Sequence, residues 1–212
     1  MKLFQMEQEN HKLPLHSVRL EALGDGVFAV AMTILAIELK WPELEDTSWH
    51  AFAHSFHQLL PGLLCFVISF VVLGIMWFGH RMVFEYIGRT NRYFIFLGIL
   101  FYMMICLVPV STRFLAEGSL QWGKIFVYGL NLSLCNLTLY AQWMYGIHHK
   151  GLLERELPAQ VKKEAKFLFL LSPVVYAIAI IISLWLPVIS LVIFIITPLI
   201  YLIPNKLDKY LP

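Results

Sequence analysis

Charged residues are scarce in this chain of 212 amino acids. Asp, Glu, Lys and Arg make up only 14% of the residues, whereas 59% are hydrophobic. A soluble domain carries about 25% charged and about 45–50% apolar residues, so this apolar excess cannot be hidden inside one soluble core. The composition therefore predicts a polytopic membrane protein. The formal net charge of +2 is too small to indicate a nucleic-acid partner.

Motifs for catalysis and cofactor binding are also absent. The sequence contains no Walker A or dinucleotide-binding glycine motif, no HExxH, no GxSxG, no TVGYG filter and no arginine-rich voltage-sensing helix. No residue pattern suggests a catalytic nucleophile together with its general base. We therefore expect that the protein is not an enzyme and has no catalytic residue and no cofactor. The three cysteines, Cys65, Cys106 and Cys135, lie in apolar runs and form no CxxC pair. We expect buried thiols without a disulfide or a metal.

Several apolar stretches are long enough to cross a bilayer as helices, which takes about 20 residues. They cover residues 18–39, 58–79, 93–111, 125–145, 167–183 and 187–204. Pro187 suits the first turn of a helix, so the last two stretches should form a tight helical hairpin. Pro173 and Pro198 fall inside these helices and should kink them. The predicted fold class is all-α, with six transmembrane helices and no P-loop selectivity filter.

Basic residues predict the orientation. Most of the 16 Lys and Arg lie near the termini or in the loops 80–92 and 146–166, and only Lys40, Arg113 and Lys124 lie on the other side. Basic loops stay in the cytoplasm, so both termini should be cytoplasmic in a multi-pass protein of the cell membrane. The loop 146–166 has the composition of a short amphipathic surface helix.

These expectations divide the chain into three parts. Residues 1–17 form a cytoplasmic N-terminal segment, which is polar and lacks the apolar core of a cleavable signal peptide. Residues 18–204 form the six-helix transmembrane domain, and residues 205–212 form a cytoplasmic C-terminal tail.

The first apolar stretch carries an unusual number of charges. Residues 18–39 read VRLEALGDGVFAVAMTILAIEL and contain Arg19, Asp25 and Glu38. An ionised residue at mid-helix opposes membrane insertion by roughly 2.5–3.5 kcal/mol. We therefore expect these charges to serve the function or to hold the helix in place.

The same stretch has an apolar stripe. At 100° per residue, Val30, Ile34 and Ile37 share one face with Thr33 at its edge, and Asp25 points about 140° away from Val30. Such a stripe commonly faces lipid or a packed helix. Lining a pore is the alternative.

Short motifs resemble a known channel family. Residues 19–25, RLEALGD, resemble the R-x-x-x-F-S-D signature that opens the first helix of the transmembrane protein 175 family of endosomal and lysosomal potassium channels. Trp77-Phe-Gly-His80 is similar to the W-x-x-H at the end of the family's second helix. Asn91 begins the third helix, and Pro109 and Thr112 close it in the family's style. The resemblance covers roughly residues 1–115.

The sequence departs from the family pattern at two places. Leu23 and Gly24 replace the Phe-Ser of the signature, and Gly79 stands where the family often has the first His of a pair. The additional glycine either loosens the start of the helix or allows a close helix contact.

The resemblance implies a potassium-permeable, weakly selective cation channel, with K⁺ as the permeant ion. It implies a homotetramer in the lipid bilayer, in which the first helix lines the pore and rings of branched side chains constrict it. Carried over from Asp25, the rings are Val30, Ile34 and Ile37, with Thr33 beside them. These are the residues of the apolar stripe.

Two further roles follow from the same reading. We expect Glu38 to lie at the outer mouth of the pore, where its carboxylate concentrates cations. A structural polar cluster is expected at the cytoplasmic ends of the first three helices, where it holds the first helix in place. Its members are Arg19, Asp25, Trp77, His80 and Asn91.

The alternative function is a proton-coupled secondary transporter. In that case Asp25 and His80 form a proton relay, since a histidine can titrate near neutral pH.

Three histidines precede the second apolar stretch. His50, His54 and His57 follow at i, i+4 and i+7, a spacing that could bind zinc or copper on one helical face. No cysteine or nearby carboxylate completes such a site. We therefore favour an amphipathic turn at the membrane surface, without a metal.

Overall fold

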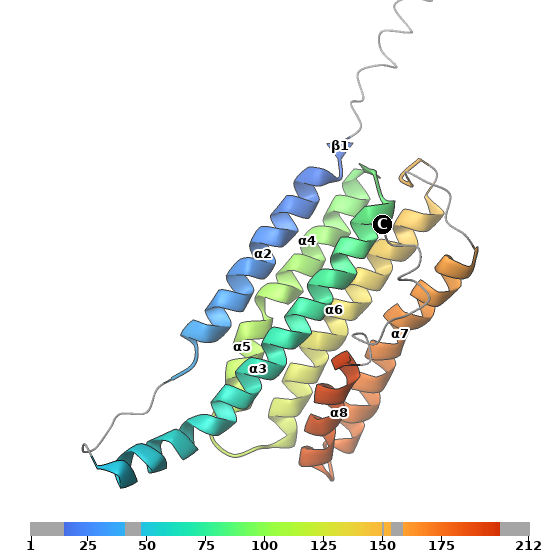
Figure 1. The fold of residues 1–212 in the computed structure, drawn as a ribbon. Coiled ribbons are helices and arrows are strands. Elements are labelled where there is room, and N and C mark those ends of the chain that lie inside the picture. Colours follow the sequence, from blue (N-terminus) through green and yellow to red (C-terminus); the bar gives the residue numbers. More distant parts are fainter. Residues whose placement is uncertain (1–14, 41–47, 150, 154–158, 200–212) are drawn as a thin grey trace, which may run out of the picture.

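The chain forms a bundle of long helices that run up and down side by side (Figure 1). The computed structural model describes residues 15–40, 48–149, 151–153 and 159–199. In chain order the elements are β1 (Leu15–His16), α2 (Val18–Ile37), α3 (Trp49–Tyr86), β2 (Arg89–Thr90), α4 (Arg92–Cys106), α5 (Val108–Ala116), α6 (Trp122–His148), α7 (Ala159–Ile182) and α8 (Pro187–Leu199).

The prediction of an all-α membrane protein is confirmed. The described part of each predicted apolar stretch lies mainly on a helix, and the third stretch lies on α4 and α5 together. Residues 200–204 of the last stretch lie outside the described residues. By length and composition α2, α3 and the run Arg92–Ala116 can cross a membrane, and α7 and α8 contain the shorter apolar segments Phe169–Ile182 and Pro187–Leu199. Within the described ranges, the sheet is limited to the antiparallel pair β1–β2. The predicted tail 205–212 lies outside the described residues, as does most of the segment 1–17.

Some boundaries differ from the predicted ones. The second helix, α3, begins at Trp49 because the Ser48 hydroxyl accepts a hydrogen bond from the Ala51 amide and caps the helix (3.2 Å). It continues through Pro61. The last helical hairpin contains Pro173 and Pro198 inside α7 and α8, as predicted.

The described residues of the loop 146–166, which exclude 150 and 154–158, contain no separate surface helix. The first residues of the loop still belong to α6, which ends at His148, and its last residues belong to α7, which begins at Ala159. The prediction for the cysteines is correct for Cys65 and Cys135, which are buried, and wrong for Cys106, which is exposed on α4.

The third span is interrupted at Leu107, where α4 ends and α5 begins. Pro109 lies in the first turn of α5, where its missing amide proton breaks the helical hydrogen-bond ladder. The hydroxyls of Ser111 and Thr112 donate to the Val108 carbonyl at 3.0 and 2.8 Å. Such bonds satisfy a carbonyl near the break and bend a helix locally.

A chain of buried hydrogen bonds fixes α5 against its neighbours. Thr112 Oγ1, whose proton goes to the Val108 carbonyl, accepts from Ser69 Oγ of α3 (2.8 Å), and Ser69 Oγ lies 3.0 Å from the Tyr128 hydroxyl of α6. The residue before Thr112 is held in the same way, since Asn131 Nδ2 of α6 donates to Ser111 Oγ (3.1 Å). All five side chains are buried. Because an unpaired buried polar group is costly, these bonds hold α5 in one rotation about its axis.

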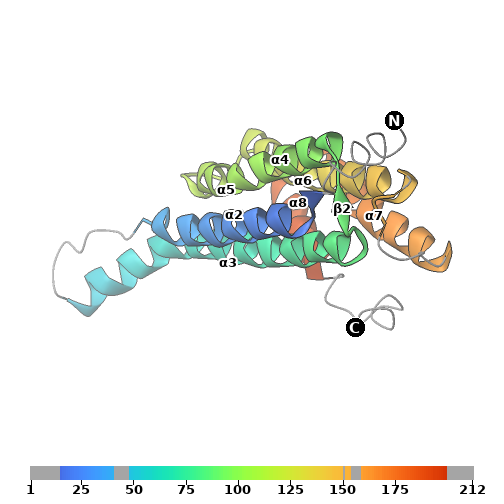
Figure 2. The ribbon, with the colours of Figure 1, turned by 90° about the horizontal axis from the view of Figure 1, so that it is seen from above.

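Large aromatic side chains fill much of the core. Its large, fully buried side chains include Phe94, Phe101, Tyr128 and Trp143. Seen from above, α2 and α3 lie side by side, and α4 and α5 run alongside them (Figure 2). The first span, α2, contacts α3, α4 and α5 and lies at the edge of the bundle (Figure 1).

Candidate functional site

The first span packs against the bundle by only one of its faces. Its buried residues are Leu20, Gly24, Phe28, Ala31 and Leu35. The predicted ring residues Val30, Ile34 and Ile37 lie off that face, where they are 57%, 38% and 79% exposed. A continuous apolar face that a single chain leaves uncovered calls for lipid or another protein surface.

Thr33 is exposed on the same face of α2. Its hydroxyl donates to the Val30 carbonyl at 2.8 Å. The hydroxyl proton is therefore used within the helix, while the oxygen keeps lone pairs that can accept a hydrogen bond or contact a cation.

Asp25 is held by the neighbouring helix. Trp77 Nε1 of α3 donates to Asp25 Oδ1 at 2.7 Å. The Arg81 guanidinium lies 6.0 Å from the centre of the Trp77 ring, at the outer limit for a cation–π contact. The structure thus brings together Asp25 and Trp77, two of the residues of the predicted polar cluster, and joins α2 to α3.

His80 takes part in a second, buried contact. The Tyr102 hydroxyl of α4 donates to the Leu20 carbonyl of α2 (2.7 Å) and lies 2.8 Å from His80 Nε2. Because the single hydroxyl proton goes to the carbonyl, His80 must donate to Tyr102 from Nε2, which leaves Nδ1 unprotonated in the neutral ring. No hydrogen-bond partner for Nδ1 is present in the described part of the chain.

The histidine ring is surrounded by aromatic side chains. Its centre lies 4.7 Å from that of Phe84, 5.7 Å from Phe101 and 5.8 Å from Phe28. Asp25 and His80 thus engage different partners, and no hydrogen bond joins them among the described residues. The geometry lends no support to a proton relay between the two.

Gly24 explains how α2 approaches this cluster so closely. A Cβ atom at position 24 would lie 2.6 Å from His80 Cε1 and 2.7 Å from the Tyr102 hydroxyl. Only glycine fits at that distance without a shift of its neighbours. Of the two possibilities open from the sequence, the structure therefore shows the close helix contact.

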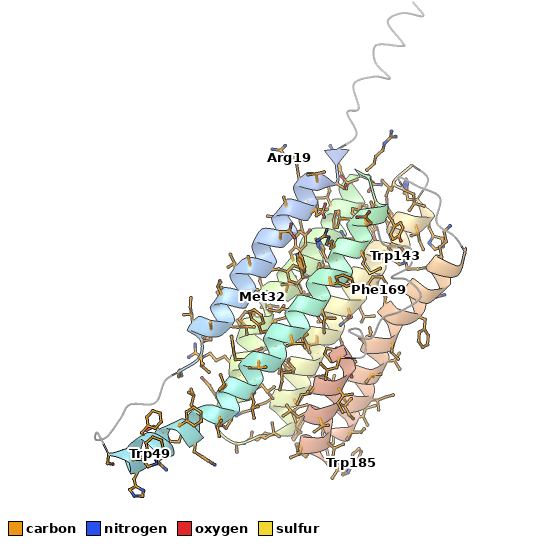
Figure 3. The ribbon with its side chains drawn as sticks, viewed as in Figure 1. Arg19, Met32, Trp49, Trp143, Phe169 and Trp185 are labelled. Atoms are coloured by element: carbon orange, nitrogen blue, oxygen red, sulfur yellow. The ribbon has the colours of Figure 1, made fainter. Side chains whose placement is uncertain are left out.

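The remaining members of the predicted cluster lie elsewhere. Arg19 is exposed at the start of α2, at the edge of the bundle (Figure 3), and within the described residues it forms no ion pair with Asp25. Asn91 caps α4, since its Oδ1 accepts from the Phe94 amide (2.9 Å), and its Nδ2 donates to the Tyr145 hydroxyl of α6 (2.8 Å). The expected single cluster is therefore divided into separate contacts.

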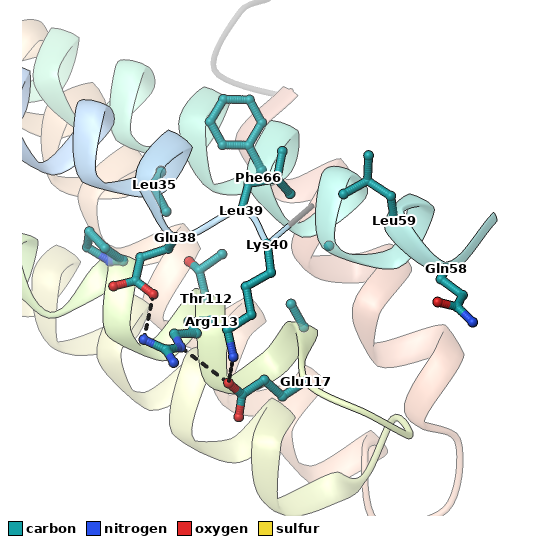
Figure 4. A pocket seen from close by; sticks show the side chains of 13 residues that line it. Leu35, Glu38, Leu39, Lys40, Gln58, Leu59, Phe66, Thr112, Arg113 and Glu117 are labelled. Carbon is teal, nitrogen blue, oxygen red and sulfur yellow. Dashed lines mark hydrogen bonds and ion pairs between the residues drawn. The ribbon is translucent and has the colours of Figure 1, made fainter. Parts of the chain in front are cut away.

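Glu38 lies at the other end of α2, turned toward α5. Arg113 Nη1 donates to Glu38 Oε2 at 2.8 Å, and Arg113 Nε donates to Glu117 Oε1 at 3.2 Å. Lys40 Nζ completes the group with Glu117 Oε1 at 3.4 Å (Figure 4). We call these four residues the outer ion-pair cluster. In this cluster the Glu38 carboxylate is paired with Arg113, whereas the sequence suggested a free carboxylate at a pore mouth.

A pocket of about 200 Å³ lies beside this cluster, between the end of α2, the first half of α3 and α5 (Figure 4). Leu35, Leu59 and Phe66 line its apolar part, and the outer ion-pair cluster lines its polar part. Sequence reasoning missed Arg113, Lys40 and Tyr102. For the first two a signal existed, because they are two of the few basic residues on the outer side.

The three histidines His50, His54 and His57 lie on the first turns of α3 itself, not on a separate surface turn. All three are exposed, and His54 Nε2 lies 3.0 Å from Gln58 Nε2. Among the residues that the structure describes, no three His, Cys, Asp or Glu side chains come close enough to hold a metal ion.

Comparison with known proteins identifies relatives. The model of the family "Endosomal/lysosomal potassium channel TMEM175" matches residues 19–109. A potassium channel of Streptomyces collinus is 31% identical over 170 residues, which covers 77% of this chain and 81% of the relative. The chain belongs to the TMEM175 family. A potassium channel of a Chryseobacterium species is 29% identical over 191 residues, or 89% of this chain and 93% of that one.

A solved structure shares the fold of this TMEM175 family member. The crystal structure of a lysosomal potassium-selective channel TMEM175 homolog from Chamaesiphon minutus superimposes with a TM-score of 0.75, at 24% sequence identity. The superposition covers 88% of this chain and 96% of that one. The family match includes α2, α3 and α4 with the contacts of Asp25 and His80, and ends before Arg113.

We expect the Gly24→Ala substitution to destabilise the protein. The added methyl group collides with His80 and Tyr102, and such overpacking typically destabilises by about 1–3 kcal/mol, against a gain of about 1 kcal/mol in helix propensity. Gly26→Ala is the matched control, because a Cβ there meets no atom within 4 Å. Thermal unfolding of the solubilised protein measures the difference. A Gly24→Ala melting temperature at or above that of Gly26→Ala contradicts the close contact.

The outer ion-pair cluster should weaken in acid. Hydrogen bonds from Arg113 and Lys40 lower the pKa of Glu117 below its ordinary value of 4.5. The ion pairs of Glu117 therefore stabilise the fold above that value and lose this effect as the pH falls through the lowered pKa. We expect Glu117→Gln to melt at a lower temperature than the wild type at neutral pH and at the same temperature in strong acid. A difference that persists in acid contradicts this prediction.

Proposed function

We propose that this protein is a potassium-permeable, weakly selective cation channel, in which four copies of α2 line a central pore. The observation that carries the proposal is the uncovered apolar stripe of Val30, Ile34 and Ile37, outside the face by which α2 packs on its own bundle. Two bacterial relatives over most of the chain's length are named potassium channels, which supports the same conclusion.

In this assembly the stripe forms stacked apolar rings. A helix rises about 1.5 Å per residue, so the rings of Val30 and Ile34 are about 6 Å apart and those of Ile34 and Ile37 about 4.5 Å apart. Narrow apolar rings gate a pore by losing their water. Because Val30 is smaller than isoleucine, the tightest points are Ile34 and Ile37.

Thr33 supplies the only hydroxyl beside these rings among the described residues of α2. Its proton is bonded to the Val30 carbonyl, so its oxygen can face the pore as an acceptor. Potassium sheds its water more readily than sodium, and four such oxygens replace part of the lost shell. This arrangement gives modest selectivity without a carbonyl filter.

The distribution of charges and tryptophans supports an orientation with both termini in the cytoplasm. Arg89 and Arg92 lie at the end of the bundle where α2 begins, which is marked by Arg19 in Figure 3. Trp49 and Trp185 lie at the opposite end and are 75% and 73% exposed. Basic residues favour the cytoplasmic side, and tryptophans gather at membrane interfaces. The protein then resides in the cell membrane, with K⁺ as its permeant ion and no cofactor.

Ion flux through purified protein in liposomes tests the proposed function. We expect cations to flow down their gradient, faster for K⁺ than for Na⁺, and without any proton counterflow. Absence of flux from folded, assembled protein contradicts the proposal. Transport that saturates and stops without a proton gradient indicates a proton-coupled transporter instead.

Substitution of the outermost ring tests the pore assignment. Ile37→Asn places a hydrated side chain in the constriction, so we expect flux to rise at least several-fold and the preference for K⁺ to fall. Ile178→Asn is the matched control, since Ile178 is 51% exposed on α7, away from the stripe. Unchanged flux and selectivity in Ile37→Asn contradict the assignment of the constriction.

A further inference from the structure

The structure assigns a positioning role to Arg113, which lies in α5 and outside the stripe. We propose that Arg113 holds the outer end of α2 against its own bundle and thereby sets the width of the ring formed by Ile37. The inference rests on the proposed function and adds to it the element that controls the outer constriction.

The contacts form a continuous bridge between two elements. Glu38 and Lys40 follow the last residue of α2, and Arg113 and Glu117 belong to α5 or its C-terminal cap. Arg113 bonds to both carboxylates, at 2.8 and 3.2 Å, and Lys40 bonds to Glu117 at 3.4 Å (Figure 4). The charges alternate in sign along this path, so each one is paired with its neighbours.

The bridge acts directly beside the stripe. Ile37 is the last residue of α2, and the Glu38 amide still donates to the Ile34 carbonyl at 2.9 Å, so Glu38 continues the helix. At 100° per residue the Glu38 side chain leaves the helix about 100° from that of Ile37. When the ion pair with Arg113 moves Glu38, the whole last turn of α2 moves with it, including Ile37.

The α5 end of the bridge is rigid. Ser111 and Thr112, the two residues before Arg113, are buried and bonded to α6 and α3 at 3.1 and 2.8 Å. The backbone at Arg113 is thus fixed to two other helices. When the bridge opens, the end of α2 is the part that moves.

The far end of α2 is held by the packing of Leu35 in the core and by the ion pairs. A pocket of about 200 Å³ lies between this end, α3 and α5, and the ion pairs form one side of it. The beginning of α2, in contrast, is held by the buried bond from Tyr102 to Leu20, by the close packing of Gly24 and by the bond from Trp77 to Asp25. The two ends of the helix are therefore attached by different means.

The direction of the effect follows from the nature of the ring. Without the bridge, the last turn of α2 is free to move toward the pore axis, where apolar Ile37 side chains from neighbouring subunits attract one another. The ring narrows and loses water, and flux falls. Exposed ion pairs contribute little to folding free energy, so the bridge acts on position more than on overall stability.

Two single substitutions separate this mechanism from simple electrostatics. Glu38→Gln removes a negative charge near the mouth and Arg113→Gln removes a positive one, so a purely electrostatic role predicts opposite changes in cation flux. The positioning role predicts that both lower the flux in liposomes, at least several-fold. The double variant Glu38→Arg with Arg113→Glu restores the pair and should return most of the flux. Arg92→Gln, at the other end of the bundle, is the charge-matched control.

A second readout does not depend on conduction. We expect hydrogen exchange of residues 34–38 to accelerate in both single variants and to slow again in the double variant, while exchange in α6 stays unchanged. Opposite flux changes in the two single variants, or unchanged exchange at residues 34–38, overturn the inference. If the wild type carries no flux, the proposed function fails, and the exchange rates alone decide whether Arg113 holds α2.

Discussion

The close approach of α2 to α3 and α4 is the constraint on which the rest of the arrangement depends. One hydroxyl, that of Tyr102, bonds to the backbone of α2 and to His80 of α3. This contact exists because position 24 has no side chain. In a membrane, polar groups must find partners inside the protein, so the three-helix contact also fixes the rotation of α2. That rotation turns Val30, Ile34 and Ile37 away from the bundle.

The two ends of α2 differ in the physics of their attachment. At the beginning, Tyr102 and His80 form buried hydrogen bonds in an aromatic surrounding, and Trp77 donates to the Asp25 carboxylate. At the far end the attachment consists of exposed ion pairs beside a pocket, which salt and acid weaken. In the proposed channel, this difference allows the far end of α2 to change the width of the Ile37 ring.

The interruption of the third span serves this arrangement. Pro109 separates α5 from α4. Within the core, Ser111 of α5 pairs with Asn131 of α6, and Thr112 of α5 pairs with Ser69 of α3. Neutral hydroxyl and amide groups can be buried at low cost once they are paired, whereas an unpaired one is expensive. The pairing selects one rotation of α5, and in that rotation Arg113 reaches Glu38.

The sequence by itself determined the helices and the apolar stripe of α2, because these follow from a local period of 3.6 residues. It predicted Asp25 and Trp77 in one polar cluster with Arg19, His80 and Asn91, and of this cluster the structure joins Trp77 to Asp25. The start of α4 at Asn91 is also local, since Asn91 Oδ1 accepts from the amide three residues further on. Only the tertiary structure decided that Asn91 Nδ2 bonds to the Tyr145 hydroxyl. The same holds for Glu38, which pairs with an arginine 75 residues away. Such pairings depend on how helices are rotated and shifted against one another, and no local pattern of residues encodes that.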